Sequence, residues 1–285
     1  MIKKLLSIWW FRILIFPFLT LFILFITSEF EFPDKNDEFF YINLCFSLLI
    51  ASITIDFLRA GNYFLLFGLK YTKYSFYEIA LSFIFNLIFF LLIVLLIFLN
   101  NDLNLKINNY LKSIMIIQFG IYLFIWAVVE EFIFRGILFQ ALIDKFGFYF
   151  SSFIISLIFS FFHIFNPYVN FISFLNTFLF SYLFCLMYFQ TKSLYLPISF
   201  HFSWNLLSAL LINSNISGYK LINGLFDYKY ENLNHIIFGG QYGIEAGILT
   251  TIYSFLMIII VLFNFQPHPF IQSRLFKREI LESNF

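Results

Sequence analysis

The sequence predicts an all-α polytopic membrane protein, a bundle of about eight transmembrane helices. Of its 285 residues, 61% are hydrophobic and 12% are charged, and the mean hydropathy is +0.89. A soluble domain is nearer half apolar and a quarter charged. Apolar runs long enough to cross a bilayer recur along the chain, separated by polar segments. The length fits one such domain and leaves no room for a second folded domain.

The first three spans are expected within residues 1–110. Basic residues and two tryptophans precede the first apolar run, residues 13–27, and no small-residue cleavage site follows it. We therefore expect an uncleaved first span rather than a signal peptide. The second and third spans cover about residues 39–58 and 76–99, and the intervening residues 60–75 are expected to form a loop or an interfacial helix.

Five more spans are expected in the C-terminal part, at about residues 114–142, 149–165, 171–189, 194–211 and 244–263. A long polar loop precedes the last of them and closes with the run Gly239-Gly240-Gln241-Tyr242-Gly243. The organisation predicted is therefore N-terminal transmembrane helices at 1–110, a helical core at 111–265 and a cytoplasmic tail at 266–285.

An even number of spans places both termini on one side of the membrane. Most of the lysines and arginines in the predicted loops fall on that same side, so the positive-inside rule places both termini in the cytoplasm. A bacterial inner (cytoplasmic) membrane is the expected location. The formal net charge of +1 indicates no nucleic-acid partner, which leaves membrane lipids as the expected surroundings. Cys45 and Cys185 both fall in apolar spans and imply neither a disulfide nor a metal–thiolate site.

Three ionisable residues lie inside the fourth predicted span: Glu130, Glu131 and Arg135. Such residues are rare within membranes and indicate a functional site by default. Glu131 and Arg135 are four positions apart, so they share a helix face and can pair. Glu130 is turned about 100° away by the 3.6-residue period and needs a partner from elsewhere in the chain.

Two other spans carry groups suited to chemistry. The fifth holds His163 near its end, and the seventh holds His201 with Asn205 one turn later on the same face. At the helical rise, Glu130 and His163 each lie roughly 21–22 Å from the cytoplasmic ends of their helices, and Asn205 lies about 18 Å from its own. His201 is shallower, at about 12 Å, unless its helix starts deeper or tilts.

These residue types suit hydrolysis in a pocket that excludes water. A carboxylate such as Glu130 can act with His163 as the general base for a water molecule. His201 and Asn205 can donate hydrogen bonds to the oxyanion of a tetrahedral intermediate. The alternative is a zinc site made of Glu130, His163 and His201, although the ligands come from three helices and no H-E-x-x-H motif is present.

Each residue also has a purely structural interpretation. A single buried histidine such as His163 is often only a satisfied core residue. The pair His201 and Asn205 can make hydrogen bonds between helices, which are common in membranes. Glu131 and Arg135 are expected to be structural, fixing one helix and tuning the field of the site. The structural interpretation is weakest for Glu130, because its position offers no cation as well placed as that of Glu131.

At these residues the chain resembles the CPBP family of intramembrane proteases, which includes type II CAAX prenyl endopeptidases and Abi-like proteins. The family is recognised by E-E-x-x-x-R, then F-x-x-x-H, then H-x-x-x-N or H-x-x-x-D. All three motifs occur here in order, as Glu130 to Arg135, Phe159 to His163 and His201 to Asn205. The run that begins at Gly239 and ends at Glu245 is a weaker match to a segment before the last helix of many members.

The resemblance implies a helical bundle whose cavity opens toward the cytoplasm, and endopeptidase activity, so residues 111–265 would be a CPBP-like catalytic core. In the family the first glutamate and the histidine of the second motif, here Glu130 and His163, activate water. The last histidine and the asparagine, here His201 and Asn205, form the oxyanion hole. Members have been described both as metalloproteases and as glutamate-dependent enzymes, and we expect no cofactor here, with zinc as the alternative.

The expected function is therefore hydrolysis of a peptide bond in a CAAX-type or related membrane-proximal peptide or protein, with or without a lipid on the substrate. Two alternatives remain open. One is a non-catalytic membrane protein, such as a bacteriocin self-immunity factor or a scaffold. The other is a transporter that uses Glu130 and the histidines as a proton relay.

Overall fold

The computed structural model describes residues 2–28, 37–60, 67–69, 71, 73–99, 106–107, 113–227 and 234–264. The predicted tail at 266–285 lies outside these residues. The long helices are Trp9–Ser28 (α2), Asp37–Ala60 (α3), Lys73–Leu99 (α4), Ser113–Glu131 (α5), Gln140–Phe162 (α6), Phe171–Thr191 (α7), Tyr195–Ile212 (α8) and Ile248–Asn264 (α10). The all-α membrane fold predicted from the sequence is confirmed.

Shorter elements connect the long helices. They are the helices Ile2–Leu6 (α1) and His235–Phe238 (α9), the π-helix Phe132–Phe139 (η1) and the 3₁₀ helices Gly240–Tyr242 (η3) and Ile244–Ala246 (η4). Two-residue strands, Lys106–Ile107 (β1) and Phe226–Asp227 (β2), pair antiparallel, with Lys106 opposite Asp227 and Ile107 opposite Phe226. The loop predicted at 213–243 therefore contains short ordered elements, and the last long helix starts at Ile248 rather than at Ile244.

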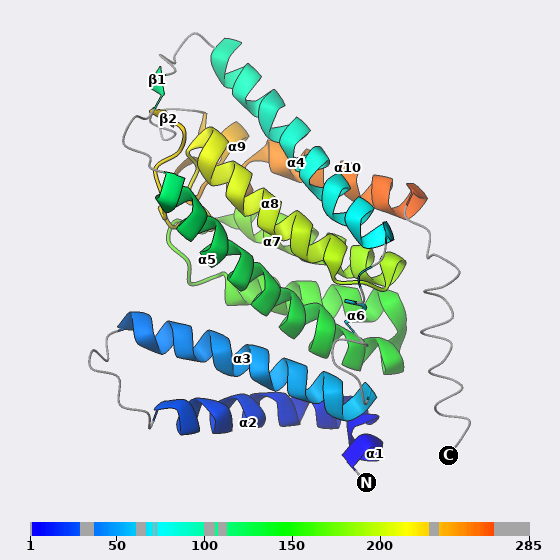
Figure 1. Ribbon diagram of the computed structural model, residues 1–285. Coiled ribbons are helices and arrows are strands. Elements are labelled where there is room, and N and C mark those ends of the chain that lie inside the picture. Colours follow the sequence, from blue (N-terminus) through cyan, green and yellow to red (C-terminus); the bar gives the residue numbers. More distant parts are fainter. Residues whose placement is uncertain are drawn as a thin grey trace.

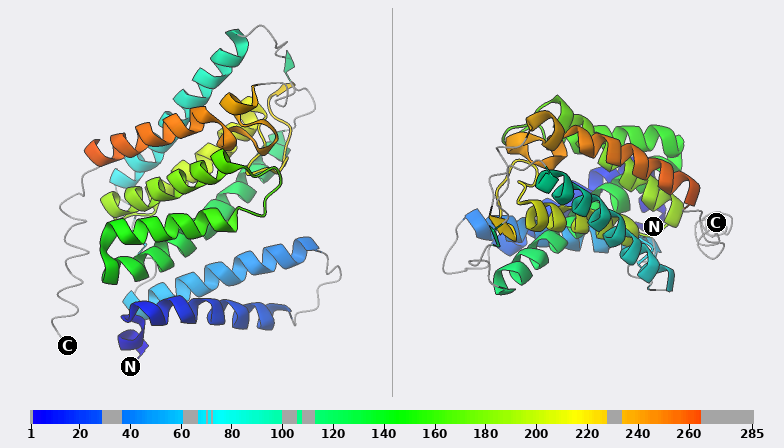
Figure 2. Two further views of the ribbon diagram at one scale, coloured as in Figure 1. Left: turned by 180° about the vertical axis from the view of Figure 1, so that it is seen from behind. Right: turned by 90° about the horizontal axis from the view of Figure 1, so that it is seen from above.

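The helices form one bundle with the motif-bearing helices in its middle. Figure 1 shows α2 and α3 side by side at one edge, α4 and α10 toward the opposite edge, and α5 to α8 between them. The left view of Figure 2 shows the same order from behind. The helices that carry the three motifs therefore lie between two flanking groups of helices.

Six helices of the described chain are long and apolar enough to cross a membrane. They are Trp9–Ser28, Phe40–Arg59, Tyr74–Leu99, Ser113–Phe162, Phe171–Thr191 and Tyr195–Ile212. Many large apolar side chains point out of the bundle, such as Phe18 at 67% exposure and Phe25 at 64%. Such surfaces are stable against lipid, so the chain is an integral membrane protein. The predicted count of eight spans is not confirmed, because residues 113–162 count as one helical stretch, kinked at Gly147, and α10 has only 17 residues.

Gly147 divides the long helical stretch where the fourth predicted span ends. Its backbone is left-handed, with φ 74° and ψ 179°, inside α6. Glycine adopts this conformation without the steric cost that a Cβ imposes. The chain therefore kinks between Phe146 and Phe148, close to the predicted boundary between the fourth and fifth spans.

A charged contact joins the N-terminal hairpin of helices to the core. Arg12 of α2 is 1% exposed and pairs with Asp144 of α6. Arg59 at the end of α3 lies 3.3 Å from the same carboxylate and donates a 3.0 Å hydrogen bond to Gln140. These contacts lie at the end of the hairpin where α1 is found, and they tie α2 and α3 to the first turns of α6.

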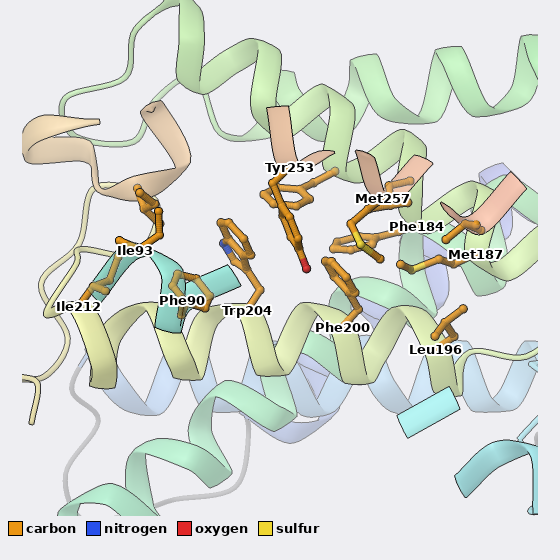
Figure 3. Close-up of a cluster of buried hydrophobic side chains, with 14 of the residues drawn as sticks. Phe90, Ile93, Phe184, Met187, Leu196, Phe200, Trp204, Ile212, Tyr253 and Met257 are labelled. Atoms are coloured by element: carbon orange, nitrogen blue, oxygen red, sulfur yellow. The ribbon is translucent and has the colours of Figure 1, made fainter. Parts of the chain in front are cut away.

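The largest buried apolar cluster lies between α4, α7, α8 and α10 (Figure 3). A polar contact crosses it at Asn86 of α4, which is fully buried. Its amide donates to the carbonyl of Phe200 at 3.0 Å and to the hydroxyl of Ser203 at 2.8 Å, and its oxygen accepts from the hydroxyl of Tyr253 at 2.8 Å. One side chain therefore connects three helices.

Replacing Asn86 tests this connection. We expect Asn86→Ala to lower the free energy of unfolding by about 1–3 kcal/mol, because three hydrogen bonds are lost and their partners stay buried. Thermal unfolding of the purified protein in detergent measures the change. Leu87→Ala, at a neighbouring position that is 40% exposed, is the control and should unfold within error of the wild type. Equal stability of the two variants would contradict the assignment.

Candidate active site

The motif with two glutamates lies where α5 changes into the π-helix η1. Glu130 and Glu131 close α5, and Arg135 and Gly136 belong to η1. π-Helical turns inside α-helices are rare and frequent at functional sites. Gly136 permits a close approach here, because a Cβ at this position would lie 2.7 Å from the ring of Phe67. The wider turn therefore packs directly against the segment between α3 and α4.

Glu131 and Arg135 form an ion pair with no exposure of either side chain. Nη1 of Arg135 donates to Oε1 of Glu131 at 3.1 Å, which confirms the predicted pairing. Nη2 donates to the carbonyl and hydroxyl oxygens of Ser181 on α7, at 3.1 and 2.8 Å. The rings of Phe159 and Phe184 lie 4.9 and 5.0 Å from the guanidinium carbon. Cation–π contact covers the parts of the guanidinium that hydrogen bonds leave bare.

His201 of α8 lies between the two glutamates. Its Nδ1 is 3.0 Å from Oε1 of Glu131, and its Nε2 is 3.9 Å from Oε2 of Glu130. The ring stacks on Phe184 of α7 at 5.3 Å between centroids. Because a carboxylate paired with Arg135 can only accept, we assign the Nδ1 proton to the bond with Glu131. Nε2 is then the ring atom that faces Glu130.

Glu130 is the more exposed of the two glutamates. Its side chain is 26% exposed, whereas Glu131 is fully buried. Oε2 of Glu130 is itself buried and makes no hydrogen bond within the described part of the chain. Cys45 of α3 and Tyr122 of α5 lie within electrostatic range of this carboxylate. The partner that the sequence required for Glu130 is therefore the ring of His201, across a gap too long for a direct hydrogen bond.

His163 and Asn205 are near neighbours of the site but make no direct contact with Glu130. His163 caps the C-terminus of α6, and its Nδ1 lies 2.8 Å from the carbonyl of Phe159. Its ring packs on that of Phe159, 4.6 Å between centroids, and Phe159 in turn contacts Arg135. Asn205 lies one turn after His201 on α8 and is half-buried. Neither side chain is within hydrogen-bond distance of Glu130 among the described residues.

The described residues do not form a metal cage. No three of their histidine, cysteine, aspartate and glutamate side chains lie close enough together to hold one ion. The alternative zinc set of Glu130, His163 and His201 is therefore not assembled in this conformation, since His163 stands apart from the other two. We derive no catalytic step through a metal.

Two features of the site escaped sequence reasoning. The bond from His201 to Glu131 was not expected, because the pairing of Glu131 with Arg135 had already provided that carboxylate with a partner. Ser181 carries no motif, and only its contact with Arg135 shows its part in the site. The first feature depends on how α8 packs against α5, and no sequence pattern signals the second.

Comparison with known proteins agrees with this geometry. Residues 112–207 match the family model described as Rce1-like, type II CAAX prenyl endopeptidase Rce1-like. No curated protein matches the chain. All three motifs, from Glu130 to Asn205, fall within the matched segment. The segment that builds the site is thus similar to type II CAAX prenyl endopeptidases of the Rce1-like family, which supports the resemblance to CPBP intramembrane proteases that the motifs indicate.

Proposed function

We propose that the protein is an intramembrane endopeptidase in which Glu130 activates a water molecule for attack on a peptide bond. The observation that carries the proposal is the position of His201 between two adjacent carboxylates, of which one is buried and the other accessible. Oε2 of Glu130 and Nε2 of His201 are 3.9 Å apart, too far for a direct hydrogen bond, and a modest widening of this gap would let one water molecule bind both atoms. That water would be the nucleophile.

The two glutamates have different roles in this mechanism. Glu130 takes the proton of the attacking water as general base and returns it to the leaving amine. Glu131 forms the ion pair with Arg135, and it holds the ring of His201 through Nδ1. A carboxylate on Nδ1 also stabilises positive charge on an imidazole, as in other histidine–carboxylate pairs. His201 can therefore carry a proton on Nε2 toward the reacting atoms.

Asn205 and His163 complete the proposed set. The amide of Asn205, one turn from His201, would donate to the oxyanion together with Nε2 of His201. His163 has its Nδ1 occupied by the carbonyl of Phe159, so its Nε2 remains for the water or the substrate. The family resemblance supports these two roles, and both need the side chains to close on the substrate when it binds.

The proposed substrate is a membrane-proximal peptide or protein, of the CAAX type or a related kind. The match to a CAAX prenyl endopeptidase family supports this class. A substrate that carries an isoprenoid would approach from the lipid that surrounds the bundle. Bilayer lipids are therefore its expected environment, and no nucleic acid takes part.

The carboxylate of Glu130 can be tested with an isosteric change. We expect Glu130→Gln to lower kcat at least about 100-fold, because the amide cannot accept a proton. The measurement is cleavage of internally quenched CAAX peptides, farnesylated and unmodified, by purified protein in detergent, with and without a strong chelator. Glu78→Gln is a matched control, since Glu78 is a second buried glutamate on α4 outside the site.

Activity of Glu130→Gln at the wild-type rate would contradict the role of Glu130. A wild type that cleaves none of these peptides would contradict the endopeptidase proposal. Loss of activity with the chelator, restored by added zinc, would replace the general-base role of Glu130 with that of a metal ligand.

The support that Glu131 gives to His201 leads to a separate expectation. Glu131→Gln should lower kcat about 10- to 100-fold with little change in KM, because the ring loses its orientation and its counter-charge. The same change leaves Arg135 without a charged partner, so the thermal midpoint should fall as well. Kinetics and thermal unfolding on the same preparation separate the two effects. An unfolding midpoint that falls while kcat per folded molecule stays constant would leave Glu131 with a structural role only.

We also propose that the protein lies in a bacterial inner membrane with both termini in the cytoplasm. Gly147 supports this orientation, because a kink there lets residues 113–162 cross the membrane twice, and α10 would supply one further crossing. Alkaline phosphatase fused after Phe285 should be inactive in cells, and green fluorescent protein at the same site should fluoresce. The reverse pattern would place the C-terminus outside.

A further inference from the structure

The segment between α9 and α10, residues Gly239–Gly247, folds into a compact series of tight turns, called here the glycine-rich segment. Gly239–Gly247 contains the two short 3₁₀ helices η3 and η4. Gly243 has a φ of 106°, and a Cβ there would lie 2.1 Å from the carbonyl oxygen of Asn215. Asn176 of α7 donates to the carbonyls of Glu245 and Gly247, at 2.8 and 3.0 Å. The segment is therefore pinned to α7 on one side and to the loop after α8 on the other.

One carboxylate in this segment connects two parts of the site. Oε2 of Glu245 accepts hydrogen bonds from the backbone nitrogen and the hydroxyl of Ser217, at 2.8 and 2.9 Å. Oε1 accepts from the indole nitrogen of Trp204 on α8, at 3.3 Å. Within the described chain these are the only polar contacts of that carboxylate. Trp204 is the residue before Asn205 and lies three positions after His201.

The residues next to Ser217 reach the turn that carries His163. Gly218 has a φ of 89°, and a Cβ there would lie 2.2 Å from the carbonyl oxygen of Pro167, four residues after His163. The backbone nitrogen of Gly218 donates to the carbonyl of Tyr242 at 2.8 Å. The loop around Ser217 therefore packs between the turn that follows His163 and the glycine-rich segment.

Tyr242 makes a second approach to the same turn. Its side chain is 1% exposed, and its hydroxyl lies close to Ser217, Asn166 and Thr177, although none of them is in hydrogen-bond geometry with it. Burial, and then the charge of Glu245, raise the pKa of Tyr242 above its usual range, so the phenol stays neutral. The glycine-rich segment thus places the buried ring of Tyr242 next to the turn that follows His163.

Trp204 connects the carboxylate of Glu245 to α8. It is 2% exposed and stacks on Phe89 and Tyr253, at 5.4 and 5.7 Å between centroids. Figure 3 shows it beside Tyr253 in the large apolar cluster. The indole is therefore buried among aromatic rings and held at its nitrogen by Glu245, and both contacts restrain the orientation of α8 at this residue.

We propose that Glu245 is a positioning residue that sets the distance between His163 and the pair His201 and Asn205. The inference rests on the proposed endopeptidase function. One rigid carboxylate holds Trp204 of α8 and Ser217, whose neighbour abuts the His163 turn. His163 and Asn205 make no direct contact, so the alignment of the two requires an external link. Misplacement of a reacting group by about 1 Å can cost 100-fold in rate.

A double-mutant cycle, with the wild-type protein as reference, tests the connection between Glu245 and Trp204. Glu245→Gln and Trp204→Phe should each lower kcat about 10- to 100-fold with KM nearly unchanged. The double variant should be no slower than the slower single variant, because both changes break one connection. Ser217→Ala, which removes one hydrogen bond to Glu245, provides a milder variant and should lower kcat without unfolding the protein. The assay uses the farnesylated quenched peptide.

A spectroscopic measurement that needs no activity accompanies the kinetics. In protein with ¹⁵N-labelled tryptophan, the indole N–H resonance that disappears in Trp204→Phe should shift upfield in Glu245→Gln, as the charged acceptor is lost. Leu87→Ala is the control, since it changes a 40% exposed side chain of α4 that makes no contact with Glu245. It should leave both the resonance and kcat unchanged.

The outcomes separate this inference from the proposed function. Wild-type protein that cleaves the peptide, with Glu245→Gln and Ser217→Ala equally fast, would overturn the positioning role and leave the endopeptidase proposal intact. Independent, additive losses in the cycle would also overturn it. Wild-type protein that cleaves no peptide would instead contradict the proposed function, while the resonance shift would still report the contact between Glu245 and Trp204.

Discussion

Burying a charge among apolar helices costs several kcal/mol per ion unless a counter-charge and hydrogen bonds compensate. Glu131 and Arg135 meet this constraint as an ion pair, and three surrounding helices supply the pair's other contacts. Helix α7 supplies Ser181 to the guanidinium, α6 and α7 supply the rings above it, and α8 brings His201 to the carboxylate. Four segments of the bundle therefore converge on one ion pair.

The two adjacent glutamates show how a helix can give the same residue type two environments. Glu131 points into the bundle, where its charge is neutralised and its geometry is fixed. Glu130, one position earlier, faces a less enclosed region and keeps part of its side chain exposed. The ring of His201 joins the two environments, so a proton at the accessible carboxylate and a charge at the buried one act on the same imidazole.

Hydropathy was enough to predict the membrane fold, because apolar runs of about 20 residues with few charges are typical of transmembrane helices. The spacing of Glu131 and Arg135 was enough to predict their contact, because it depends only on the helical period. The meeting of His201 with both glutamates depends on how α8 packs against α5, and no local pattern encodes that. Nor could the sequence show that η1 would be a π-helix or that the chain would kink at Gly147, because these depend on packing around Gly136 and on the backbone conformation of Gly147.

The buried contact of Arg12 with Asp144 has a consequence for biogenesis. Residues near the N-terminus enter the membrane first, well before Asp144 has been synthesised. Until then the guanidinium of Arg12 has to extend to the membrane interface, as long basic side chains do near helix ends. The charged contact of α2 with α6 can therefore form only after α6 has been synthesised. The ion pair of Arg12 and Asp144 is therefore one of the later contacts to form as the bundle assembles.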